Sequence, residues 1–115
     1  MELVTDLWVQ ALIHRARLGG AYATVARKGD ARAGAVLVKG VDLRAGRARL
    51  WSEAVRGDGR QVWMQPHPGA DEAALDAYAE RQARYDPDLW VVEIEDPDAS
   101  RFLTEPVEPE PPAAA

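Results

Sequence analysis

The chain has 115 residues, of which 47% are hydrophobic and 29% are charged, so it can form one small domain with a buried core. It contains no cysteine and two histidines, which excludes disulfides, thiol catalysis and cysteine-based zinc sites. No apolar run approaches the roughly 20 residues of a membrane-spanning helix, and Glu2 stands where a signal peptide carries basic residues. We therefore expect a cytoplasmic protein without a membrane partner.

The net charge of -5 is divided unevenly along the chain. Residues 1–65 hold eleven Arg and Lys against six Asp and Glu, whereas residues 66–115 hold three against thirteen. The basic half raises the idea of nucleic-acid binding, but its basic residues are scattered, and a pI near 5.0 is low for a protein that binds phosphate backbones. We therefore expect no nucleic-acid partner, and complementarity between the two halves is the alternative.

The spacing of apolar residues predicts a first helix over residues 6–18. Asp6 is a suitable N-cap, and the pair Gly19-Gly20 is a suitable end. The apolar residues that share one helical face are Val4, Trp8, Ala11, Leu12 and Leu18. Because the segment is short, a strand that alternates from Leu7 to Ile13 is the alternative interpretation.

Four strands are predicted next, over residues 22–28, 34–39, 47–55 and 60–65. The second is a continuous apolar run, typical of a buried strand, and the last two alternate between two faces. Gly57-Asp58-Gly59 lies between the last two strands and offers the positive-φ positions of a tight hairpin. Four successive strands joined by short turns predict an antiparallel meander.

The second half of the chain predicts one more helix, one more strand and a tail. The helix covers residues 71–85, begins at the N-cap Asp71 and ends before Asp86-Pro87. The strand covers residues 89–95, and the Pro-, Glu- and Ala-rich residues 104–115 predict a disordered tail after a single domain of residues 1–103. The order α-β-β-β-β-α-β predicts an α+β fold, with a mostly antiparallel sheet and both helices on one face.

Three distinctive stretches run through this domain. They read LWVQALIHR at 7–15, RKGD leading to AGAVLVK within 27–39, and ERQ leading to YDPDLWVVEIED within 80–96. Together they resemble a family of small alphaproteobacterial proteins catalogued as a domain of unknown function, over nearly the whole chain up to about residue 103. The resemblance implies a cytoplasmic bacterial protein and brings no activity, cofactor or catalytic residue with it.

Acidic residues gather around the last predicted strand. Asp86 and Asp88 precede this strand, while Glu93 and Glu95 share one face of it. Carboxylates of this kind could hold Mg²⁺ or Mn²⁺ for phosphodiester chemistry, but the lysine of the nuclease pattern is missing. We therefore favour a structural interpretation, in which the aspartates form caps and turns and the glutamates are solvated or paired with arginine.

Tryptophan and arginine share one face of the predicted hairpin. With a three-residue loop, Trp63 lies opposite Glu53 and diagonal to Trp51, whereas a two-residue loop would separate the indoles. The resulting strip consists of Arg47, Arg49, Trp51, Gln61, Trp63 and Gln65. Tryptophan and arginine are enriched at binding hot spots, so the strip could be an exposed interface. In the other interpretation, a further element covers this face and the indoles belong to the core.

These patterns favour a non-enzymatic protein-binding or regulatory module without a cofactor. Its interface candidates are Arg47, Arg49, Trp51 and Trp63, and its partner is another protein or a second copy of the chain. The alternative function is a small metal-dependent phosphoesterase that uses the acidic group of Asp86, Asp88, Glu93 and Glu95.

Overall fold

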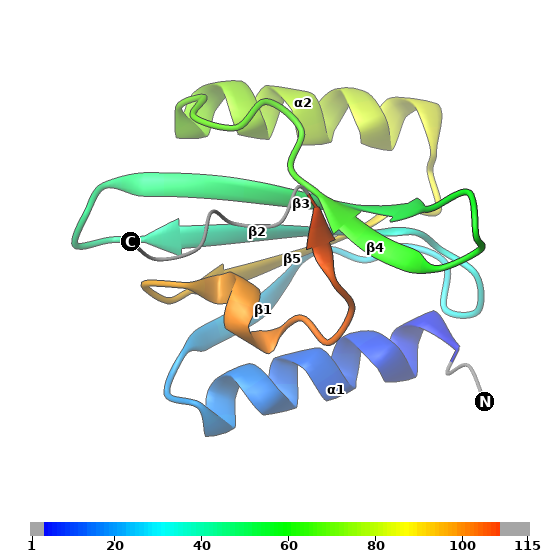
Figure 1. The fold of residues 1–115 in the computed structure, drawn as a ribbon, viewed down its shortest axis with the longest axis horizontal. Coiled ribbons are helices and arrows are strands. Elements are labelled where there is room, and N and C mark those ends of the chain that lie inside the picture. The colour runs from blue at the N-terminus through cyan, green and yellow to red at the C-terminus, as the bar shows by residue number, and fades with distance from the viewer. Residues whose placement is uncertain (1–3, 109–115) are drawn as a thin grey trace.

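A computed structural model describes residues 4–108, which form a six-stranded sheet between two helices (Figure 1). In chain order the elements are α1 (Thr5–Leu18), β1 (Tyr22–Arg27), β2 (Val36–Asp42), β3 (Arg47–Val55), β4 (Gln61–Met64), α2 (Glu72–Tyr85), β5 (Trp90–Glu95), the short 3-10 helix η1 (Ala99–Phe102) and β6 (Val107–Glu108). The predicted order of helices and strands up to β5 is confirmed. No helix within residues 4–108 is long and apolar enough to cross a membrane.

The sheet is mixed, and its strand order is β1-β5-β2-β3-β4-β6. β5 lies between β1 and β2, antiparallel to β1 and parallel to β2, so the predicted meander is restricted to β2, β3 and β4. β6 adds a second parallel pair beside β4. The physical reason is that β2 is buried on both faces and β5 is buried on the face of Trp90, Val92 and Ile94 and at Val91 on the other, which suits strands in the centre of a sheet.

The two helices lie on opposite faces of the sheet, so the prediction that they share one face is wrong (Figure 1). α1 packs on the face that contains Val38 and Val92, and α2 packs through Leu75 on the face that contains Leu37 and Leu50. Successive residues of β2 point to opposite faces, and all of them except Lys39 and Asp42 are buried, which requires a cover on each side. The apolar run of β2 therefore indicates a three-layer arrangement.

Local signals in the sequence form most of the expected turns and caps. The predicted N-cap of the first helix is wrong, because α1 begins after Val4 and Asp6 lies in its first turn. The Asp71 side chain accepts a hydrogen bond of 2.8 Å from the backbone N–H of Ala74 and caps α2. The backbone N–H of Arg56 donates to the carbonyl of Arg60 at 2.8 Å, which closes a three-residue hairpin loop rather than a two-residue one. Glu53 consequently lies opposite Trp63, as that loop length requires.

The chain after β5 is ordered further than the sequence suggests. η1 begins after Asp98, whose carboxylate accepts from the backbone N–H of Ser100. Residues 104–108, the start of the predicted tail, include β6, and the backbone N–H of Trp63 donates to the carbonyl of Pro106 at 2.8 Å. Residues 109–115 of the predicted tail lie outside the described residues.

The connection before β2 is held tightly against the start of β5. The backbone N–H of Asp30 donates to the carbonyl of Asp88 at 2.9 Å, and the indole N–H of Trp90 donates to the carbonyl of Asp30 at 2.7 Å. A Cβ at Gly29 would clash with the Asp88 carbonyl, so this close approach requires glycine. These contacts fix β5 in its place between β1 and β2.

Candidate binding site

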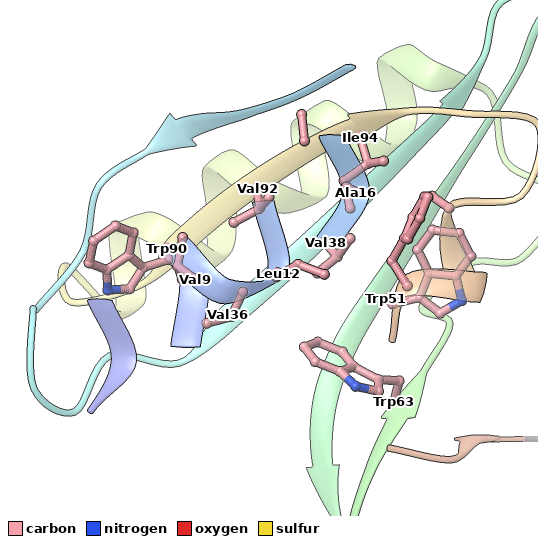
Figure 2. Packing of buried hydrophobic residues seen from close by; sticks show 13 residues of the cluster. Val9, Leu12, Ala16, Val36, Val38, Trp51, Trp63, Trp90, Val92 and Ile94 are labelled. Atoms are coloured by element: carbon pink, nitrogen blue, oxygen red, sulfur yellow. The ribbon is translucent and has the colours of Figure 1, made fainter. Parts of the chain in front are cut away.

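Trp51 and Trp63 point to the same face of the sheet, but both are buried (Figure 2). Their exposed fractions are 1% and 0%. Trp8 of α1 packs on Trp63 with 5.7 Å between ring centroids, and Ala99 of η1 lies close to Trp51 above Gly40. The structure therefore places the two indoles in the core, as in the second interpretation of the strip.

The buried indole N–H groups differ in their hydrogen bonding. Trp63 donates to a carboxylate oxygen of Glu105 at 2.9 Å, and Trp90 donates to a backbone carbonyl. The indole N–H of Trp51 is buried and has no acceptor within residues 4–108. Its nitrogen lies on the side of the ring turned away from Leu12 and Val38 (Figure 2). Since buried polar groups in folded proteins are nearly always paired, this donor calls for an explanation.

Arg47 and Arg49 lie on the same face of β3 as Trp51 and remain exposed. Neither guanidinium makes an ion pair or a hydrogen bond with any other of residues 4–108. Together with Trp51 they line a small cavity of about 160 Å³, which we call the arginine hollow. Its full lining is Gly40, Asp42, Arg47, Arg49, Trp51, Asp96, Pro97, Asp98 and Ala99.

The three carboxylates of the arginine hollow already have donors of their own. Asp42 accepts two backbone N–H groups of the turn that follows it, at 3.1 and 3.2 Å. Asp96 pairs with Arg101 at 2.8 Å, and this hydrogen-bonded guanidinium holds the pKa of Asp96 below its usual range. Asp98 accepts from the backbone and hydroxyl of Ser100. Neither Arg47 nor Arg49 is among the donors to these three carboxylates.

A wider groove of about 760 Å³ shares Arg47, Arg49 and Trp51 with the arginine hollow. It extends from these side chains to the N-terminal end of α2 and also reaches Ser100 of η1. Apolar side chains, among them those of Ala48, Ala70, Pro68 and Val107, contribute to its walls. The hollow and this groove together offer charged and apolar surface side by side.

Glu53, at the other end of the same face, is a residue that sequence reasoning did not select. Its carboxylate accepts from the backbone N–H of Val36 at 2.7 Å and from the side chain of Gln61. Burial raises the pKa of Glu53, with a further contribution from the charge of Glu105, and outweighs the opposing effect of the two hydrogen bonds. Glu53 lines a half-open cleft of about 770 Å³ beside Trp8. Its occupied oxygens indicate that it ties β2, β3 and β4 together.

The acidic residues around β5 do not converge on one point. Asp86 ends α2 and accepts from the backbone N–H of Asp88 at 3.0 Å, whereas Glu93 lies farther along β5, 3.5 Å from the ammonium of Lys39. Glu95 lies opposite Tyr22, the first residue of β1. Within residues 4–108, no three or more His, Cys, Asp or Glu side chains are placed to hold a metal ion. The geometry therefore does not favour the metal-dependent alternative.

Glu93 lies close to the ammonium group of Lys39, which also contacts two acidic side chains of α2. The side chain of Lys39 is 12% exposed, and its ammonium lies 2.6 Å from Glu72 and 2.8 Å from Asp76 of α2. Burial alone would lower the pKa of Lys39, but hydrogen bonds to Asp76 and Glu72 and the charges of Asp76 and Glu93 outweigh burial and raise it. Lys39 therefore stays charged and anchors α2 to the sheet.

Comparison with known proteins shows a family over nearly the whole chain. The family "Protein of unknown function (DUF1491)" matches residues 3–104, while no curated protein matches. The crystal structure of a DUF1491 family protein from Caulobacter crescentus CB15 is 72% identical, with a TM-score of 0.88 over 93% of this chain and 100% of that one. A solution structure of a protein from A. tumefaciens is 32% identical, with a TM-score of 0.81 over 96% and 100%. The chain therefore belongs to the DUF1491 family, as the resemblance of its three sequence stretches indicates.

Proposed function

We propose that this chain is a non-enzymatic binding module, and that the arginine hollow and its adjoining groove form the binding surface. The observation that carries the proposal is a row of three hydrogen-bond donors on one face of β3. Arg47 and Arg49 have no partner within residues 4–108, and neither does the buried indole N–H of Trp51. The two exposed guanidinium groups are available to a partner's acceptors, and the buried indole N–H beside the same cavity lacks an acceptor.

The partner in this proposal is another protein or a second copy of the chain. The groove offers apolar walls beside charged side chains, as protein interfaces do. The net charge of -5 opposes binding to nucleic acid. A cytoplasmic location is part of the proposal, because a chain without cysteine has no need of an oxidising compartment.

Native mass spectrometry of the protein purified gently from its own cells tests this function. We expect a species heavier than one chain for the wild type and its loss in the double variant Arg47→Glu, Arg49→Glu. The control is Arg81→Glu, Arg84→Glu, which makes the same change of charge on exposed residues of α2. A bare monomer for the wild type, or a heavier species that survives in the first variant, would contradict the proposal.

A further inference from the structure

We infer that the arginine hollow binds a carboxylate, which accepts hydrogen bonds from Arg47, Arg49 and the buried N–H of Trp51. This inference rests on the proposed function and names the chemical group that the partner offers. It explains together two features that are otherwise unrelated. One is a buried indole N–H without an acceptor, and the other is a pair of arginines that leave the neighbouring aspartates to other donors.

The chemistry of the donors suits a small planar anion. Arg47, Arg49 and Trp51 alternate along one face of β3, so neighbouring members of the row are roughly 7 Å apart. A guanidinium presents two parallel N–H groups, which match the two oxygens of a carboxylate. The volume of about 160 Å³ holds one carboxyl-bearing group rather than a large ligand. The inference requires one carboxylate oxygen to reach the buried indole N–H of Trp51.

The charges around the hollow select a carboxylate over a phosphate. Arg101 neutralises Asp96, which leaves Asp42 and Asp98 opposite the two free arginines. A carboxylate adds one negative charge to this balanced lining, whereas a phosphate adds nearly two and is repelled more strongly by both aspartates. A cation is disfavoured because the two free guanidinium groups are positively charged and the indole offers only a donor.

The indole N–H groups provide the readout for a test on the full-length chain. In ¹H–¹⁵N spectra we would add sodium acetate, an Ac-Gly-Glu-Gly-amide peptide, the matching glutamine peptide, or sodium phosphate, all at equal ionic strength. We expect acetate and the glutamate peptide to shift the Trp51 indole signal in a saturable way. The indole signals of Trp63 and Trp90, which already have acceptors, should stay in place as internal controls.

The variant Arg47→Gln, Arg49→Gln is expected to weaken this binding by at least about tenfold, because it removes charge-assisted hydrogen bonds. A stronger response to the glutamate peptide than to acetate supports an acidic protein segment as the source of the carboxylate, and equal responses support a free carboxylic acid. The inference is overturned if no carboxylate moves the Trp51 signal, or if phosphate or the glutamine peptide moves it equally.

Failure of this inference and failure of the proposed function give different results. If the Trp51 signal stays fixed while the double glutamate variant still loses its heavier species, the surface binds a partner but not through a carboxylate. If carboxylates shift the signal while the protein from its own cells is a bare monomer, the hollow binds the anion and the protein-binding function is wrong.

Discussion

Replacing Trp63 by alanine is expected to lower the free energy of unfolding by about 3–5 kcal/mol, the usual cost of emptying a buried aromatic site. Trp63 has an exposed fraction of 0%, packs on Trp8 and donates its indole N–H to Glu105. Domains of this size are stable by only about 5–15 kcal/mol. The substitution therefore removes a large share of the stability, which an exposed interface residue would not do.

Urea unfolding followed by circular dichroism measures this effect, and Trp63→Phe is the matched control. Phenylalanine keeps most of the apolar contact and loses the hydrogen bond to Glu105, so we expect a smaller loss of about 1–2 kcal/mol. A change below about 0.5 kcal/mol for Trp63→Ala is typical of a surface position. Such a result would mean that Trp63 is not part of the core.

Replacing Glu53 by glutamine is expected to raise the free energy of unfolding at pH 7, by up to about 1 kcal/mol. The amide oxygen can still accept from Val36, and the amide N–H₂ can donate to the side-chain oxygen of Gln61 after that amide turns over. The variant removes a partly buried negative charge and its repulsion by Glu105. Stability therefore increases although no new contact forms.

The gain in stability from Glu53→Gln depends on pH, because burial raises the pKa of Glu53. Because the pKa of Glu53 is raised in the folded state, protonation stabilises the fold, and this gain is complete below the pKa of an unfolded glutamate. It disappears as the pH rises through the higher folded-state pKa. Unfolding at pH 7 and pH 3.5 should therefore show a difference between variant and wild type that shrinks in acid.

Glu80→Gln, on an exposed position of α2, is the control for the loss of one surface charge. We expect it to change the free energy of unfolding by less than about 0.5 kcal/mol at either pH. A Glu53→Gln variant that is less stable than the wild type at pH 7 would show that the charged carboxylate makes a net stabilising contribution.

Local patterns in the sequence were sufficient to locate most elements of the fold. β3 covers Arg47–Val55 as predicted, and α1, α2, β1, β2, β4 and β5 differ from their predicted bounds by a few residues. Alternation, helical spacing, the Asp71 cap and the hairpin glycines all act within a few residues of one another. Such signals determine a helix, strand or turn without any contact between distant segments.

The order of the strands and the faces of the helices depend on contacts between distant segments. The insertion of β5 between β1 and β2 requires the Asp30–Asp88 contact, which joins residues 58 positions apart. The short pair of β6 with β4 likewise depends on Trp63 and Pro106. No pattern of neighbouring residues in the sequence indicates that these strands pair. The apolar character of both faces of β2 was visible, however, and was a signal for helices on both sides.

The candidate site was predictable as a set of residues but not as a surface. Alternation along β3 placed Arg47, Arg49 and Trp51 on one face, and the hairpin loop aligned Trp63 with them. The arginines are exposed and the indoles are buried because η1 and Trp8, which belong to other parts of the chain, pack on the indoles. The unpartnered N–H of Trp51 is a property of packing, and no sequence pattern reports it.

Photo-crosslinking inside growing cells tests the central claim, that the arginine hollow is where this protein meets its partner. A photoreactive residue at Pro97, which lines the hollow and is exposed, is compared with one at Tyr85, which is 85% exposed at the end of α2. We expect a crosslinked adduct from position 97 but not from position 85, and its loss when Arg47→Glu and Arg49→Glu are added. No adduct at position 97, or the same adduct from both positions, would contradict this claim.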